Sequence, residues 1–142
     1  MNAETRQFIE GPFNKGIDLW RSGRYDESLK ILLKLATRFP DHPPLLGVIA
    51  SVYFEMDDLE HAIEYFKRTV ELSPKSELAS RGLFHSLYRS GFKDRAFSEI
   101  RRFLSLRSSD EYLRLLSELN EELFLSPGYY LKISDNNKTS RN

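Results

Sequence analysis

The chain has 142 residues, with 21 Lys and Arg residues balanced by 21 Asp and Glu residues and no cysteine. This length suits one domain, and the formal charge of zero disfavours general DNA or RNA binding, which exploits an excess of positive charge. Disulfides, thiolate metal sites and cysteine nucleophiles are excluded. No apolar run approaches the roughly 20 residues that cross a bilayer, and the first residues lack the features of a signal peptide. We therefore expect a cytoplasmic protein with no membrane insertion.

A constant repeat period organises most of the chain. Three sets of residues recur at a spacing of 34 residues: Gly23, Asp57 and Gly91; Ser28, Ala62 and Ala96; and Leu32, Phe66 and Ile100. A period of this size is typical of stacked helical or strand units that share one continuous core. After an N-terminal lead-in at 1–8, the register predicts three units at 9–42, 43–76 and 77–110.

Each unit is predicted to form two short helices. In the second unit, the apolar residues of the first helix recur at i, i+3, i+4 and i+7 and share one face: Leu46, Ile49, Ala50 and Tyr53. Gly23 and Gly91 tolerate the positive φ that often follows a helix end, and Asp57 reaches it at modest cost. Pro40 and Pro74 close the first two units because proline cannot continue a helix.

One more helix is predicted at 111–125, beyond the third unit. Ser108 and Glu111 have the spacing of a capping box, and the apolar residues that follow form one stripe: Tyr112, Leu116, Leu119 and Leu123. Such a helix suits a cap over the last repeat, and a partner-binding helix is the alternative. The segment Ser126-Pro127-Gly128 ends it, and 126–142 is expected to be a flexible tail.

This pattern resembles the tetratricopeptide repeat family, whose motif favours W-x2-L-G-x2-Y, then A-x3-F, then P within each repeat. The second unit matches through Ala50, Tyr53, Ala62, Phe66 and Pro74, the first through Gly16, Leu19, Gly23, Tyr25, Leu32 and Pro40, and the third through Leu83, Leu87, Gly91, Ala96 and Ile100. The resemblance implies an all-α fold, a right-handed α-solenoid of antiparallel helix pairs. Phe84 and Phe103 stand where small residues are usual, so we expect looser or locally shifted packing in the third unit.

Motifs for chemistry are missing from the sequence. The three histidines, His42, His61 and His85, do not have metal-ligand spacing, and the chain has no phosphate-binding glycine loop and no nucleophile elbow. Adjacent carboxylates such as Asp57 and Asp58 point in different directions on a helix and do not form an acid/base pair. We expect no metal, no cofactor and no catalytic residues, and therefore no enzyme.

The resemblance implies a concave groove lined by the first helix of each unit. Its register places an aromatic column, neighbouring groove residues and a charged rim: Trp20, Phe54 and Tyr88; Phe13, Ile17, Leu78, Arg81 and His85; and Arg21, Glu55 and Arg89. An aromatic groove suits a partner helix or an extended apolar segment. The alternative is that these aromatic residues are packing residues, with Trp20 in the core.

Family members that hold acidic chaperone tails use a clamp of Lys, Asn and Arg side chains. The corresponding places here carry none of these residue types: Phe13, Ile17, Val48, Leu78 and Gly82. A co-chaperone role through that clamp is not expected.

The sequence therefore predicts a non-enzymatic adaptor or scaffold that binds a protein or peptide partner in its groove. One alternative is a small bacterial chaperone or immunity protein that sequesters a secreted effector or toxin. Another is a structural solenoid that self-assembles, which makes a homo-oligomer possible. The third unit is basic, which favours either an acidic partner or a solvated helix face.

Overall fold

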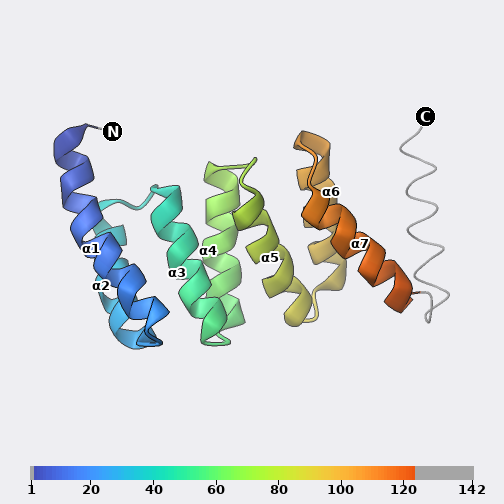
Figure 1. Cartoon of the computed structure of the whole chain (residues 1–142), viewed down its shortest axis with the longest axis horizontal. Coiled ribbons are helices and arrows are strands. Elements are labelled where there is room, and N and C mark those ends of the chain that lie inside the picture. The colour runs from blue at the N-terminus through green and yellow to red at the C-terminus, as the bar shows by residue number, and fades with distance from the viewer. Residues whose placement is uncertain (1, 124–142) are drawn as a thin grey trace. The chain divides into compact units, whose positions relative to one another are not determined.

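The computed structural model describes residues 2–123, which form seven α-helices and no strand (Figure 1). The helices are α1 (Ala3–Arg21), α2 (Tyr25–Arg38), α3 (Pro43–Glu55), α4 (Leu59–Leu72), α5 (Glu77–Arg89), α6 (Lys93–Leu106) and α7 (Asp110–Leu123). The chain divides into two compact parts. One ends at Arg107 and contains α1 to α6, and the other starts at Ser108 and contains α7. The all-α prediction is confirmed.

The part that ends at Arg107 is a stack of three antiparallel helix pairs, α1–α2, α3–α4 and α5–α6, in which each pair packs on the next (Figure 1). The first helix of the stack has 19 residues, against 13 in α3 and in α5. It is longer because the expected lead-in at 1–8 is helical from Ala3 onward, where the Asn2 side chain accepts a hydrogen bond of 2.8 Å from the Thr5 amide. The stack is the solenoid that the repeat period predicts.

The turn inside each pair repeats one hydrogen-bonding motif. The residue at the shared position has positive φ, at 76° in Gly23, 60° in Asp57 and 88° in Gly91. In the first turn, the Gly23 amide donates to the Trp20 carbonyl at 2.9 Å and the Arg24 amide donates to the Leu19 carbonyl at 2.8 Å. The other two turns have the same pair of bonds at the equivalent positions. These are Schellman motifs, which satisfy the last carbonyls of each first helix.

An arginine ties each of the last two pairs to the end of the preceding unit. Arg68 on α4 donates to the Pro40 carbonyl at 3.1 Å, and Arg102 on α6 donates to the Pro74 carbonyl at 2.9 Å. Donors and acceptors are each separated by one repeat. The repeated contact holds the connection between units against the second helix of the next unit, so it helps to fix where α3 and α5 begin.

Two glycines allow close approach between helices. A Cβ on Gly16 would lie 2.4 Å from a Leu32 methyl carbon, and a Cβ on Gly82 would lie 2.3 Å from the Phe66 ring. The Ser28 hydroxyl also donates to the Gly16 carbonyl at 2.6 Å, which joins α1 to α2 at the same place. Real side chains are not found at such short separations, so these helices can pack this closely only where one of them has no side chain.

The two large residues of the third unit, at places where small residues are usual, are both buried. Phe84 is 2% exposed and Phe103 is fully buried. The Phe84 ring lies 6.1 Å from the Phe97 ring in an edge-to-face arrangement and stacks on Tyr88 at 5.7 Å. This unit fills its interior with aromatic rings where the first unit uses glycine and aliphatic residues.

In the part of the chain that starts at Ser108, the N-cap of α7 lies one residue later than the capping box predicts. The Tyr112 amide donates to Ser109 Oγ at 3.1 Å, so Ser109 caps the helix and the prediction of Ser108 was wrong. Serine is equally good at either position, and the helix takes the one that directly precedes Asp110. The last two residues of the predicted 111–125 helix and the expected tail at 126–142 lie outside the described residues.

Candidate partner-binding groove

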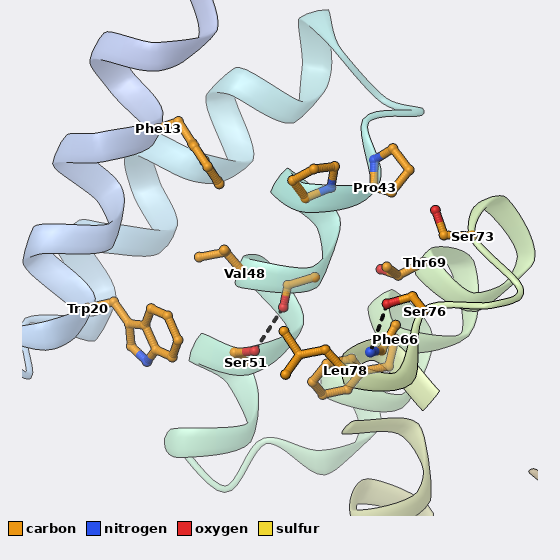
Figure 2. Close-up of a pocket in the computed structure, with 13 residues that line it drawn as sticks. Phe13, Trp20, Pro43, Val48, Ser51, Phe66, Thr69, Ser73, Ser76 and Leu78 are labelled. Carbon is orange, nitrogen blue, oxygen red and sulfur yellow. Dashed lines mark hydrogen bonds between the residues drawn. The ribbon is translucent and has the colours of Figure 1, made fainter. Parts of the chain in front are cut away.

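A groove of about 450 Å³ is formed by residues of α1, α3, α4 and α5 and of the α4–α5 connection. Its lining residues are Phe13 and Trp20; Pro43, Pro44, Gly47, Val48 and Ser51; Phe66 and Thr69; Ser73 and Ser76; and Leu78 and Ala79. Figure 2 shows the two aromatic side chains of α1 facing Val48, with Leu78 on the opposite side. The groove therefore crosses the first helices of all three pairs, with α3 in the middle.

Apolar side chains dominate this groove, and one of them is largely exposed to solvent. Leu78, in the first turn of α5, is 75% exposed. Phe13, Trp20 and Val48 are partly buried. Single exposed apolar residues are common, but a hollow surface with several of them together is typical of a binding site.

Polar groups in the groove are few, and most are already paired. None of the thirteen lining residues has an ionisable side chain. Ser51 Oγ donates to the Gly47 carbonyl at 2.9 Å, and Thr69 Oγ1 donates to the Tyr65 carbonyl at 2.7 Å. Ser76 Oγ accepts from the Ala79 amide at 3.2 Å as the N-cap of α5. Three of the four hydroxyl side chains in the lining are thus bonded to backbone groups of the protein itself.

Trp20 belongs to the groove and to the core at once. Its ring packs against a buried cluster that joins α1, α2 and α3: Ile9, Leu29, Leu32, Leu35, Leu45, Ile49 and Val52. It also lines the groove from the α1 side, where Figure 2 shows the indole facing Ser51 and Val48. The two interpretations of this tryptophan are thus compatible, because the partly buried side chain packs against the core and also lines the groove.

The aromatic column expected from the sequence does not line this groove as a continuous surface. The Arg89 guanidinium lies 4.9 Å from the centre of the Phe54 ring, and Arg89 also forms an ion pair of 2.6 Å with Asp57. Phe54 is thereby covered by a cation, while Glu55 beside it is exposed. This cluster connects the end of α5 to the turn between α3 and α4, a contact that the repeat register does not reveal.

The remaining predicted residues on α5 lie outside the lining of the groove. Tyr88 stacks on Phe84 and meets Phe97 edge-on at 6.3 Å, with the Lys93 ammonium 5.5 Å from its ring. His85 packs edge-on against Phe84 at 5.1 Å. Burial lowers the pKa of His85, and the nearby positive charge of Arg81 lowers this pKa further. Both effects favour the neutral imidazole.

Three of the eleven predicted groove residues therefore line the groove: Phe13, Trp20 and Leu78. On α1, Ile17 is partly buried and Arg21 is exposed, and neither is part of the lining. The prediction missed the α3 residues, although Gly47 and Val48 have the same register as inward-facing positions of the first unit. It favoured large and charged residues, whereas the middle of the groove is made of small ones. Phe66 and Thr69 come from a second helix, for which the register gave no signal.

The described part of the chain shows no alternative chemistry at this site. Within residues 2–123, no three His, Cys, Asp or Glu side chains gather in a way that could hold a metal ion. None of the helices in this range is long and apolar enough to cross a membrane. The groove itself has no ionisable side chain among its lining residues.

Comparison with protein families finds a match to the family described as "Psidin, N-terminal TPR repeats region", over residues 13–97. The Phagocyte signaling-impaired protein of Drosophila pseudoobscura pseudoobscura is 35% identical over 75 residues, which are 53% of this chain and 8% of that protein. The chain thus corresponds to a small part of this curated relative. The resemblance to tetratricopeptide repeats is confirmed.

Solved structures share the fold at low sequence identity. The first TPR of Spaghetti (RPAP3), bound to the HSP90 peptide SRMEEVD, matches with a TM-score of 0.72 and 22% identity, over 82% of this chain and 94% of that chain. MamA from Desulfovibrio magneticus RS-1, from residue 41 to its end, matches with a TM-score of 0.63 and 20% identity, over 67% of this chain and 54% of that chain. At such identities the likeness shows the helical solenoid alone.

Proposed function

This chain belongs to the family of the Psidin N-terminal TPR repeats region, and on that premise we propose that it is a non-enzymatic adaptor that binds a partner polypeptide in the groove. The observation that carries the proposal is the apolar lining from α1, α3 and α5, with Leu78 75% exposed. A solvent-exposed apolar hollow of this size is costly unless a partner covers it. A solved structure with this fold holds a peptide, which supports a polypeptide as the ligand.

Two other roles from the sequence remain tied to the same surface. A chaperone or immunity protein would sequester one effector or toxin in the groove, and a self-assembling solenoid would stack end to end with other copies. Light scattering over a concentration series separates these roles, because the adaptor and the chaperone stay monomeric without their partner. A cytoplasmic location is part of our proposal, since a chain without cysteine suits a reducing compartment.

The experiment compares partner capture by the wild type and two matched variants. Val48→Asp places a charge in the groove, whereas Leu72→Asp places the same charge at the end of α4, where Leu72 is 42% exposed and outside the lining. We expect partners in cell extract to bind the wild type and Leu72→Asp and to be lost with Val48→Asp, while circular dichroism shows equal helix content. Equal capture by all three proteins would show that the binding surface lies elsewhere.

A further inference from the structure

We propose that the occupant of the groove is an amphipathic α-helix with an apolar, uncharged face, and that Gly47 provides the space for it. This inference rests on the proposed function, because it names the class of segment that the same groove accepts. It distinguishes this chain from a protein that binds an acidic tail, such as the Spaghetti domain with its peptide SRMEEVD. Three features of the groove carry it.

The first feature is charge. No lining residue is ionisable, so a carboxylate or an ammonium group of a partner would lose water in the groove without gaining a counter-charge. Burial of an unpaired charge is strongly unfavourable, and a partner avoids it by presenting apolar side chains. An acidic segment is therefore rejected by the groove itself.

The second feature is the shortage of hydrogen-bond partners in the walls. The backbone groups of the lining helices are used within those helices, and Ser51, Thr69 and Ser76 are bonded to nearby backbone groups. An extended segment would turn amide and carbonyl groups toward a wall that offers few groups to bond with them, at a cost for each unpaired group. A helix satisfies its own backbone and brings only side chains to the wall. The apolar face of a helix is thus the better match.

The third feature is the shape of the floor. Gly47 lines the groove from α3 and directly precedes Val48, which Figure 2 shows between the aromatic residues of α1 and Leu78 of α5. A Cβ at Gly47 would touch only Thr69 Cγ2, at an ordinary contact distance of 3.7 Å. An alanine at this position is therefore compatible with the packing of the helices, and we expect a longer side chain to extend into the groove that Gly47 lines. Gly47 sets the depth of the groove without being needed for the packing of the helices.

The test compares peptide binding by two variants, Gly47→Leu in the groove and Lys30→Leu outside it. Lys30 is exposed on α2 and does not line the groove, so its replacement adds the same leucine away from the site. Two displayed peptide libraries are selected on the wild type: helix-forming peptides with four randomised positions at i, i+3, i+4 and i+7, and fully random unstructured peptides. Selected peptides are then measured against both variants, with the peptide SRMEEVD as the acidic probe.

We expect helix-forming peptides with Leu, Ile, Met or Phe at the randomised positions to dominate, and to lose at least tenfold in affinity with Gly47→Leu and less than twofold with Lys30→Leu. Gly47→Ala should give an intermediate loss, and SRMEEVD should bind more weakly than the selected helices. Peptides that are sensitive to Gly47→Leu but acidic or extended would overturn the helical occupant and leave the groove as the site. Selection of no peptide that is sensitive to Gly47→Leu would overturn the groove, and with it the proposed function.

Discussion

Replacing Gly16 by alanine should destabilise the protein, although alanine is the better helix former. The new Cβ would lie 2.4 and 2.6 Å from Leu32 Cδ2 and Cγ, whereas carbon atoms in contact are normally about 3.5–4.0 Å apart. Leu32 is fully buried, so it has no space into which it can retreat. The helices must separate by about 1 Å to restore that contact distance. The Ser28 to Gly16 hydrogen bond of 2.6 Å is stretched with them.

Two effects of opposite sign decide the magnitude. Overpacking a core costs about 1–3 kcal/mol, and glycine in the middle of a helix is about 0.5–1 kcal/mol less stable than alanine. We expect Gly16→Ala to lower the free energy of unfolding by up to about 2.5 kcal/mol, the largest difference between these two effects. Gly47→Ala is the matched control, because its Cβ makes one ordinary contact at 3.7 Å and only the helix-forming gain remains. This variant should be about 0.5–1 kcal/mol more stable than the wild type.

Urea unfolding followed by circular dichroism measures both changes, with the thermal midpoint as a second reading. The two variants should differ by about 1–3 kcal/mol, in opposite directions from the wild type. Equal stabilisation by the two alanines would refute the reasoning, because it would mean that α1 and α2 do not approach closely at Gly16.

The remaining predictions concern three other residues. Asp57 has φ of 60°, so Asp57→Gly should be about 1 kcal/mol more stable than Asp57→Ala in urea unfolding, since both lose the ion pair with Arg89 and only glycine avoids the backbone strain; equal stabilities would contradict the strain. The lowered pKa of His85 means that the unfolded chain takes up a proton first as the pH falls through the ordinary value of 6.5, so stability should decline as the pH falls below that value, and less so in His85→Gln; identical pH profiles would remove this role. Trp20→Ala should lower stability by up to about 3 kcal/mol, because the ring is only partly buried against the core, and should also weaken groove-binding peptides; unchanged affinity in the folded fraction would place Trp20 outside the binding surface.

The repeat architecture could be read from the sequence because it depends on local properties. Apolar residues at helical spacing, the left-handed turn residues Gly23, Asp57 and Gly91, and the terminal prolines act within a few residues of their own position. Because the pattern recurs in all three repeats, a residue that departs from it at one position does not change the predicted architecture. Even the capping residue of α7 was wrong by only one position.

The groove depended on contacts between helices, which no local pattern contains. Phe54 has the register of a groove residue, but an arginine at the end of α5 lies over its ring and is held there by Asp57. Gly47 and Val48 look unremarkable in the sequence, and they line the groove only because residues of α1 and α5 lie on either side of α3, as Figure 2 shows for the α1 aromatics, Val48 and Leu78. Sequence alone determined which helices form and in what order they stack. Tertiary packing decided which of their side chains cover one another and which remain accessible to a partner, because that depends on the close approach of particular helices.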